Sequence, residues 1–322
     1  MDMKKTIKLK FVDFWNEFDV NDNEFLDALN KYFNVEQSEE PDYIIYSVFG
    51  YEHLHYDCIR IFYTGECQTP DFNECDYGIG FDRLSFGDRY ARIPLYNALK
   101  CKPYLKKMCH RPHFTHEDIK DRGFCSFVVS NGFSPLNRGK FFDLLSNYKK
   151  VASGGAYKNN IGELVEDKLL FLGKYKFHIA FENTAYDGYT TEKIVDAFYA
   201  NTVPIYCGDP GIAKEFNSKA FINVNDFPTF EAAIERIKEI DENEELYLQM
   251  LNEPVILPDV SLIDLEDFLV PIFQKPVSEA RRRPLSNWSV KKEIYILRYE
   301  FLEKYVYKPF ERIKNYILNI KQ

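Results

Sequence analysis

The chain has 322 residues and a mass of 38.0 kDa, about twice the length of a typical single domain, which favours two domains. Its composition, with 45% hydrophobic and 28% charged residues, is that of a globular protein and excludes a disordered or fibrous chain. The net charge of −9 is uneven: residues 281–322 carry +7 and the rest carries −16, so the acidic body argues against nucleic acid as a partner.

The first part of the chain alternates short apolar runs with helical patterns, which is typical of α/β folds with parallel sheets. We expect a strand at residues 7–14, a helix at 23–33 and buried strands at 43–48, 59–63 and 77–81. Residues 97–122 lack this pattern and are rich in Cys, Lys, His and Pro, so we expect an irregular connection or mobile loop there.

A second α/β series follows this connection. We expect strands at 124–130, 177–181, 203–207 and 221–224, and helices at 140–147, 191–200 and 230–240. Two such series predict two domains that face each other across a cleft, with ligands at the carboxyl ends of the strands.

Residues 281–322 form a basic C-terminal tail. Apolar residues at helical spacing between positions 288 and 320 predict an amphipathic helix that is interrupted near Pro309. We expect residues 288–307 to pack partly on the first domain and residues 310–322 to contact an anionic membrane surface. Packing of the whole tail on the first domain is the alternative.

The location of the protein is predicted from what the sequence lacks. It has no apolar run long enough for a transmembrane helix, and its N-terminus lacks the pattern of a signal peptide. Its seven cysteines are an odd number, which favours reduced thiols. We therefore expect a cytoplasmic protein, with contact to the inner face of the cytoplasmic membrane through its tail.

Several common binding motifs are missing. The sequence contains no G-x-G-x-x-G and no G-x-x-x-x-G-K-[ST], which disfavours hydride transfer and P-loop hydrolysis, and it has no D-x-D pair for Mn²⁺. One group could supply zinc ligands: Cys101, Cys109, His110, His113 and His116. Its spacing matches no paired C-x-x-C pattern, so we predict no metal site there.

The densest run of chemically useful residues, 181–193, lies between a predicted buried strand and a predicted helix. The N-terminus of that helix offers free backbone N–H groups, and Lys193 adds a positive charge, which together suit an anionic ligand. Glu192 adds hydrogen-bond acceptors and Tyr189 adds a hydroxyl group. Helix capping by a threonine is the simpler alternative, but it does not explain the rest of the run.

This run resembles the nucleotide-sugar signature of α1,3-fucosyltransferases, and most closely that of their bacterial members. F-E-N-T-x-x-x-G-Y-x-T-E-K-I begins at Phe181, and N-T-V-P-I-Y-x-G begins at Asn201. Further segments resemble the family at residues 62–66, 70–73, 88–96, 127–131, 138 and 141. The resemblance extends over about residues 7–227.

The resemblance implies a GT-B fold with two Rossmann-like domains, an acceptor-binding domain at 1–122 and a GDP-fucose-binding domain at 123–280, followed by the tail at 281–322. It implies an inverting transferase that moves L-fucose from GDP-fucose to the 3-hydroxyl of N-acetylglucosamine in lactosamine-type glycans, as in Lewis antigen synthesis, without a metal or other cofactor. Transfer to the 4-hydroxyl, dual specificity, and a catalytically silent glycan-binding module remain alternatives.

The resemblance also implies roles for individual residues. Glu66 aligns with the family's proposed catalytic base. The implied donor-binding residues are Arg138, Asn183, Tyr189, Glu192 and Lys193, with additional contacts from Lys158 and Gly188. Arg138 and Lys193 would hold the diphosphate, and Glu192 would accept hydrogen bonds from sugar hydroxyls. The sequence departs from the family at Cys67, where Asn is common, and at Lys158, where Arg is common.

Overall fold

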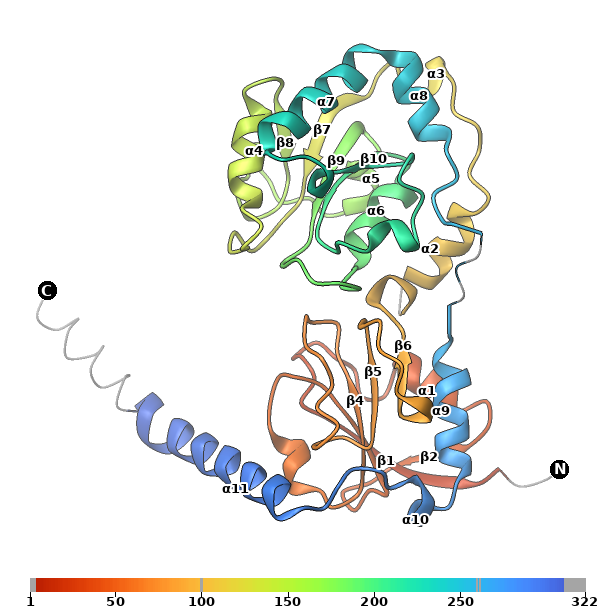
Figure 1. Ribbon diagram of the computed structural model, residues 1–322, viewed down its shortest axis with the longest axis vertical. Coiled ribbons are helices and arrows are strands. Elements are labelled where there is room, and N and C mark those ends of the chain that lie inside the picture. The colour runs from red at the N-terminus through yellow and green to blue at the C-terminus, as the bar shows by residue number, and fades with distance from the viewer. Residues whose placement is uncertain (1–3, 99–100, 259, 261, 310–322) are drawn as a thin grey trace, which may run out of the picture. The chain divides into compact units, whose positions relative to one another are not determined.

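Buried apolar runs of the sequence form a parallel β-sheet in each of the two units into which the chain divides (Figure 1). The computed structural model describes residues 4–98, 101–258, 260 and 262–309. The first unit comprises Met1–Gly80, Leu84–Ala91 and Ile263–Gln322. The second unit comprises Phe81–Arg83 and Arg92–Leu262.

The first sheet has the strand order β2-β1-β3-β4-β5-β6. Its strands are β1 (Thr6–Val12), β2 (Asn34–Gln37), β3 (Tyr43–Tyr46), β4 (Ile59–Tyr63), β5 (Tyr77–Gly80) and β6 (Tyr90–Arg92). The helices of this unit are α1 (Glu24–Leu29), α9 (Leu265–Gln274), α10 (Val277–Ala280) and α11 (Asn287–Leu302). Phe273 of α9 packs on Tyr43 of β3, with 4.4 Å between ring centroids, so the chain returns late to cover its first sheet.

The second sheet has the strand order β11-β10-β9-β7-β8. Its strands are β7 (Gly123–Phe127), β8 (Val151–Ser153), β9 (Tyr175–Phe181), β10 (Val203–Cys207) and β11 (Ile222–Asn223). The helices are α2 (Cys101–Met108), α3 (His116–Ile119), α4 (Arg138–Ser146), α5 (Lys168–Leu172), α6 (Glu192–Tyr199), α7 (Phe230–Glu242) and α8 (Glu244–Asn252).

Alternation along β9 explains how this second sheet is covered on both faces (Figure 1). Phe177, Ile179 and Phe181 pack with apolar residues of α4, α7 and α8, whereas Ala180 packs with those of α2 and α6. Successive side chains of a strand point to opposite faces, so one strand serves both layers. The loops that follow the parallel strands lie at one edge of the sheet, where the run of chemically useful residues 181–193 begins.

One expectation about secondary structure is wrong. Residues 97–122 are not irregular throughout, because they contain α2 and α3. Cys101, Leu105 and Met108 share one face of α2 and are buried against α6. Pro103 lies in the first turn of α2, where backbone N–H groups have no partner within the helix, so it does not break the helix.

The two units differ from the predicted domain ranges at three places, the shortest of which is Phe81–Arg83, a part of the second unit. Residues 92–122 belong to the second unit, because α2 packs on α6. Residues 263–280 belong to the first unit, because α9 packs on α1. The predicted ranges for residues 92–122 and 263–280 follow the order of the chain. Packing between segments that are distant in the sequence places each of these two segments in the other unit.

The basic tail is joined to acidic residues of the first unit. The ion pairs are Arg281–Asp57 at 2.6 Å, Glu293–Arg60 at 2.7 Å and Lys292–Glu74 at 2.7 Å. Arg283 is buried and pairs with the buried carboxylate of Asp76. Part of the positive charge at residues 281–293 therefore compensates carboxylates of this unit.

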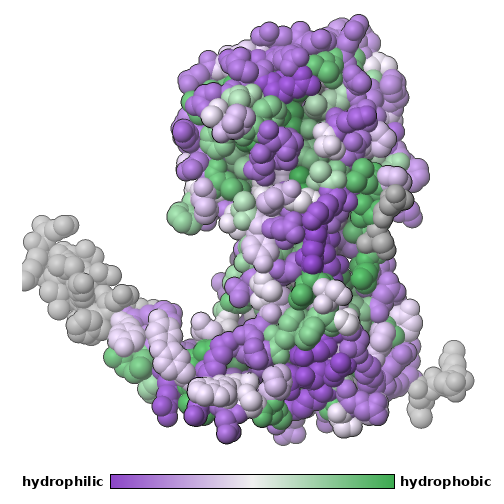
Figure 2. All heavy atoms as spheres, in the orientation of Figure 1, coloured by the Kyte–Doolittle hydropathy of each residue, from purple (hydrophilic) through white to green (hydrophobic). Residues whose placement is uncertain are grey.

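Apart from the ion pairs of Lys292 and Glu293, helix α11 makes little contact with the rest of the first unit, and none of its residues is buried. One stripe contains Val290, Ile294 and Phe301, as the amphipathic pattern predicts, but a second stripe contains Trp288, Tyr295 and Tyr299 on another side of the helix, and all six are exposed. Figure 2 shows apolar and pale residues mixed with hydrophilic ones along this helix. The segment 310–322, for which we expect membrane contact, lies outside the described residues.

Candidate donor site

The site begins where β9 ends and α6 starts. Thr191 is the N-cap of α6, and Glu182 directly follows β9. The carboxylate of Glu182 is fully buried and accepts hydrogen bonds from the Thr191 backbone N–H at 2.8 Å and from its hydroxyl at 2.7 Å. This buried carboxylate ties the end of the strand to the start of the helix.

Lys193 is the cation that compensates Glu182. Its Nζ lies 3.2 Å from Glu182 Oε2 and 3.6 Å from Glu192 Oε1. Burial by itself would lower the pKa of Lys193, but the two carboxylates raise that pKa above its usual value. Burial raises the pKa of Glu182, and Lys193 opposes that rise. Lys193 is therefore a fixed positive charge in the first turn of α6.

Arg138 is the second cation of the site and the first residue of α4. Its Nη1 donates to Asn183 Oδ1 at 3.1 Å, and its Nη2 donates to the backbone carbonyls of Asn131 and Phe133. The side chain is buried, its Nε has no partner, and burial lowers its pKa. A buried guanidinium without a carboxylate partner is suited to an anionic ligand.

A cavity of about 150 Å³ brings these groups together. Its lining is formed by Val128, Val129, Ser130, Asn131, Arg138, Lys168, His178, Ile179, Phe181, Asn183, Glu192 and Lys193. Four of the donor-binding residues predicted from the resemblance therefore line one cavity: Arg138, Asn183, Glu192 and Lys193. Burial would raise the pKa of Glu192, but Lys193 and Lys168 lower it below its usual value, so an ionised carboxylate faces the cations.

Sequence reasoning missed two polar residues of this cavity and the buried Glu182 behind it. Lys168 begins α5 and pairs with Asp196 of α6 at 2.7 Å. His178 of β9 is buried beside Ser126, with 2.9 Å between Nδ1 and the hydroxyl oxygen. Glu182 stood inside the quoted motif, but neither Lys168 nor His178 belongs to a motif that could have indicated it.

Three other predicted residues do not line the cavity. Tyr189 is buried and packs edge-on against Phe81, with 5.0 Å between ring centroids. Gly188 precedes it with a φ of +91°, and a Cβ there would lie 2.5 Å from the Phe81 carbonyl oxygen. Lys158 pairs with Asp143 at 2.7 Å. Their roles toward the donor remain predictions.

A buried carboxylate holds the loop that contains Gly188. Asp209 accepts hydrogen bonds from the Gly188 N–H at 2.8 Å and from the Thr190 hydroxyl at 3.0 Å. Arg83 donates to the same carboxylate at 3.0 Å. The loop before α6 is thus fixed by side chains that lie outside the motif.

Glu66 belongs to the first unit and follows β4. Its backbone N–H donates to the Thr64 hydroxyl at 2.9 Å, and its side chain is exposed. Within the described part of the chain its carboxylate makes no ion pair. The residue proposed as the base is therefore accessible to a ligand.

The cysteines and histidines in and after α2, for which we predict no metal site, are spread over several environments. Cys101 is buried on α2, Cys109 is exposed, and His116 pairs with Glu244. In the described residues no three His, Cys, Asp or Glu side chains are grouped as metal ligands. None of the described helices combines the length and apolar character needed to cross a membrane.

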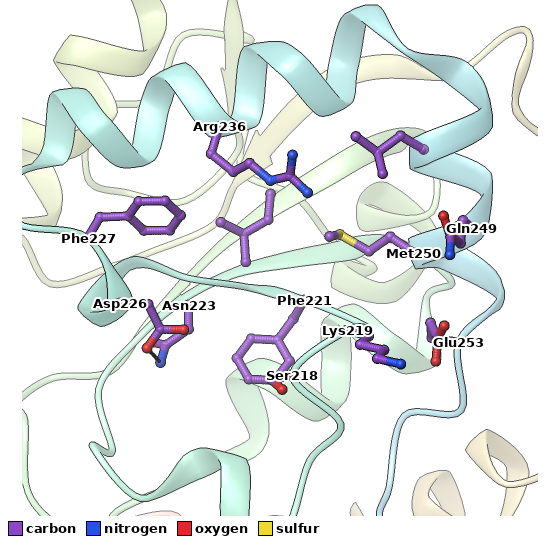
Figure 3. Close-up of a pocket in the computed structure, with 12 residues that line it drawn as sticks. Ser218, Lys219, Phe221, Asn223, Asp226, Phe227, Arg236, Gln249, Met250 and Glu253 are labelled. Atoms are coloured by element: carbon purple, nitrogen blue, oxygen red, sulfur yellow. Dashed lines mark hydrogen bonds between the residues drawn. The ribbon is translucent and has the colours of Figure 1, made fainter.

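A different cavity, of about 330 Å³, lies beside α7 and α8 (Figure 3). Arg236 and Lys219 line it together with the carboxylates of Asp226 and Glu253. Its charges are therefore mixed, with two cations matched by two carboxylates, whereas cations outnumber carboxylates in the donor cavity, and it contains no residue of the motif. The chemistry of an anionic donor is concentrated at the β9–α6 junction.

Comparison with known proteins assigns the family. Residues 9–99 match the Alpha-(1,3)-fucosyltransferase FucT N-terminal domain, and residues 119–252 match the C-terminal part of glycosyltransferase family 10 (fucosyltransferase). The Alpha-(1,3)-fucosyltransferase FucT of Helicobacter pylori is 44% identical over 223 residues, which cover 60% of this chain and 46% of that protein. A putative fucosyltransferase of Acanthamoeba polyphaga mimivirus is 36% identical over 175 residues, covering 50% of this chain and 29% of that one.

Solved structures give the same assignment. A crystal structure of an alpha1,3-fucosyltransferase with GDP-fucose is 30% identical, covers 85% of this chain and 93% of that chain, and has a TM-score of 0.70. The crystal structure with GDP covers 88% and 94% and has a TM-score of 0.71. This chain spans about half or less of the length of the curated relatives that it matches. By sequence and by its GT-B type of fold, the chain belongs to glycosyltransferase family 10, the fucosyltransferase family.

Proposed function

We propose that this chain transfers L-fucose from GDP-fucose, with inversion, to the 3-hydroxyl of N-acetylglucosamine in lactosamine-type glycans, as in Lewis antigen synthesis. The donor part is supported by the relatives, one of which has a structure with GDP-fucose. The acceptor follows from the family resemblance. Transfer to the 4-hydroxyl, alone or in addition, is the second candidate, because no motif fixes the acceptor linkage.

The observation that carries the proposal is the cavity at the β9–α6 junction. Arg138 and Lys193 line it as buried or half-buried cations, and backbone N–H groups at the start of α6 add a partial positive charge. A diphosphate carries the complementary charge, and Glu192 offers acceptors for sugar hydroxyls.

The reaction that these groups can support is a single displacement. The acceptor hydroxyl oxygen forms a bond to the anomeric carbon of fucose, while the bond from that carbon to the phosphate oxygen breaks. The electron pair of the broken bond stays on the phosphate oxygen of GDP, and Arg138 and Lys193 stabilise the negative charge that develops there. Glu66 takes the proton of the acceptor hydroxyl as a general base. Because protein cations supply the charge stabilisation, we propose that no metal or other cofactor takes part.

Two measurements test this function. GDP should raise the melting temperature of the full chain, because a ligand of the folded state alone stabilises it. Purified protein should then transfer fucose from GDP-fucose to defined type 1 and type 2 acceptors, followed by linkage analysis of the product. A product linked to the 4-hydroxyl would replace the proposed linkage, and the absence of any product would contradict transferase activity.

A catalytically silent glycan-binding module is the alternative from a different class. It would bind a lactosamine-type glycan without GDP, since glycan binding needs no diphosphate site. Stabilisation by GDP together with product formation excludes this alternative, whereas glycan binding without either effect would support it.

We further propose that the basic tail holds the protein at the anionic inner face of the cytoplasmic membrane. Residues 281–322 carry +7, and the described α11 exposes apolar and aromatic side chains. Truncation after Lys308 should leave activity and melting temperature nearly unchanged but reduce sedimentation with anionic vesicles at low salt. Neutral vesicles are the control, and unfolding of the truncated chain would contradict the proposal.

A further inference from the structure

The buried nitrogen without a partner on Arg138 has a counterpart elsewhere in the second unit. Among the described residues, the arginines with a buried side-chain nitrogen that lacks a partner are Arg138, at Nε, and Arg111, at Nη2. A buried donor left without an acceptor is costly in a folded protein. Arg138 lines the proposed donor cavity, so the similar unpaired nitrogen of Arg111 indicates a second place where an acceptor can bind.

Arg111 lines a cavity of about 420 Å³ next to the end of α2. Lys107 and His110 also line it, and Met108, Phe198 and Tyr199 provide apolar and aromatic surface. No carboxylate is among the lining residues. The cavity therefore combines a cluster of basic side chains with an apolar wall.

The contacts of Arg111 leave its charge uncompensated. Its Nε donates to Asn201 Oδ1 at 3.3 Å, and its guanidinium lies over the Phe114 ring at 5.4 Å. Arg122 lies over the same ring at 5.8 Å. Burial and the nearby Arg122 together lower the pKa of Arg111 to about 10, so an anion bound there would relieve both effects.

The neighbouring basic side chains, Lys107 and His110, are also without carboxylate partners in the described part of the chain. Lys107 Nζ donates to the Tyr199 hydroxyl at 3.0 Å, and His110 contacts the Lys106 carbonyl. In the described part of the chain, no ion pair joins Lys107, His110 or Arg111 to an acidic residue. Arg83 and Lys176 of this unit, by contrast, do have carboxylate partners, Asp209 and Asp241 respectively.

We propose that the cavity at Arg111 is a second anion-binding site, separate from the donor cavity, that accepts the phosphate group of a phosphorylated ligand. The planar guanidinium can donate two parallel hydrogen bonds to phosphate oxygens, and Lys107 and His110 can reach the others. Met108, Phe198 and Tyr199 can contact the apolar part of the same ligand. A soluble phosphorylated compound and a phospholipid headgroup present this same group.

The mixed cavity of Figure 3 shows why charge, and not cavity size alone, supports this site. There Arg236 pairs with Glu239, and Asp226 and Glu253 line the cavity beside the cations. An anion entering that cavity would meet carboxylates. At Arg111 it would meet cations and aromatic surface.

The test measures the melting temperature of the full chain against inorganic phosphate, with sodium chloride at equal ionic strength as the reference. Saturating GDP is present in every sample, so phosphate cannot act through the donor cavity. Wild type should be stabilised by phosphate, and Arg111→Gln and Lys107→Gln should each weaken the apparent affinity by roughly tenfold, as expected for loss of a charged hydrogen bond. Lys106→Gln, an exposed neighbour that does not line the cavity, should respond like wild type.

Each variant is compared with its own melting temperature without phosphate, so a loss of stability is not counted as a loss of binding. Lys107 is exposed, and its replacement keeps the proposal testable even if Arg111→Gln folds poorly. Sedimentation with phosphatidylglycerol vesicles, against phosphatidylcholine vesicles, is then measured for the same variants. The tail is unchanged in all of them, so any difference between them reports on the cavity.

The outcomes separate the sources of the phosphate. A phosphate response that depends on Arg111 and Lys107, with equal sedimentation of all variants, supports a soluble ligand. Reduced sedimentation of these two variants, but not of Lys106→Gln, supports a phospholipid headgroup. Equal phosphate responses and equal sedimentation in all variants would overturn the proposal. Failure of the donor site would instead be seen as the absence of stabilisation by GDP.

Discussion

The donor cavity of the second unit and the Glu66 region of the first unit are built in opposite ways. In the donor cavity, Glu182, Lys193 and Arg138 are held by hydrogen bonds and ion pairs before any ligand binds. Glu66 is exposed after β4, and its described hydrogen bonds, to the Thr64 hydroxyl and from the Gln68 N–H, are made by its backbone and not by its carboxylate.

This difference suits two separate tasks. Charge on a leaving diphosphate is stabilised best by groups that need not rearrange during the reaction. A general base must instead be free to accept a proton from whichever hydroxyl the acceptor presents. The comparison predicts that changes at Glu66 affect turnover alone, whereas changes around Lys193 affect donor binding and folding together.

The largest effect is expected for Glu66→Gln. This change keeps the shape and polarity of the side chain but removes the base, so the transfer rate should fall by about a hundredfold or more. Affinity for GDP, measured by calorimetry, should remain nearly the same, because Glu66 does not belong to the donor cavity.

Glu40→Gln is the matched control, since Glu40 is also an exposed carboxylate of the first unit. It should retain the wild-type rate. Near-normal turnover of Glu66→Gln would show that another group takes the proton, and weaker GDP binding would remove the contrast between the two regions.

Lys193→Ala is expected to have the next largest effect. It removes a cation from the donor cavity and leaves the buried Glu182 carboxylate without its partner. We expect GDP affinity to fall by roughly tenfold or more and the free energy of unfolding to fall by about 3 kcal/mol, since an unpaired buried charge is strongly destabilising. Calorimetry and urea unfolding measure the two losses.

The double variant Lys193→Ala/Glu182→Gln separates these losses, because it removes the stranded charge without restoring the cation. Stability should recover in part, but GDP affinity should stay low. Lys238→Ala, at a surface pair with Glu235, should change stability by less than about 1 kcal/mol. Normal GDP affinity of Lys193→Ala would contradict its role in holding the diphosphate.

His178 allows a smaller, pH-dependent test of the donor side. Burial, with a further contribution from Lys168, lowers its pKa to about 3, from a usual value of 6.5. The unfolded chain therefore binds a proton that the folded chain does not, and stability falls as the pH falls from 6.5 towards 3. For a single group this loss approaches about 1.4 kcal/mol per pH unit.

His178→Asn should flatten this dependence, because asparagine does not titrate. The free energy of unfolding, measured between pH 7 and pH 4, should fall less steeply for His178→Asn than for wild type. His55→Asn, at an exposed histidine, should keep the wild-type slope. An unchanged slope in His178→Asn would show that His178 is protonated alike in both states.

The strands and the β9–α6 junction could be predicted from the sequence because their signals are local. Buried runs such as Ile59–Tyr63 and Val203–Cys207 are short and almost wholly apolar, as central parallel strands require. The junction was recognisable because capping threonine, Glu192 and Lys193 are adjacent in the chain. Local order along the chain therefore predicted the α/β class and indicated Glu192 and Lys193, whereas Arg138 and Asn183 were predicted from the family resemblance.

The features that were missed depend on contacts between distant segments. Helix α2 was not predicted, because Pro103 and several lysines interrupt the apolar pattern of the face that packs on α6. Lys168 reaches the cavity only because α5 lies beside α6, which supplies its partner Asp196. The apolar pattern of β9 predicts that His178 is buried, but it does not show which loops form the cavity that His178 lines. Packing, and not composition, places these residues.

The smallest expected effect is that of metal removal. This experiment tests whether the cations of the donor cavity stabilise the leaving diphosphate without a metal ion. A diphosphate leaving group needs positive charge, which a transferase can obtain from a metal ion or from its own side chains. Here Arg138 and Lys193 line the donor cavity, and the sequence has no D-x-D pair. We therefore expect transfer to proceed at an unchanged rate in excess EDTA, measured as product formed from GDP-fucose. A loss of activity that Mn²⁺ or Mg²⁺ restores would show that the cations of the cavity do not suffice, and the contrast with the open Glu66 region would then lose its physical basis.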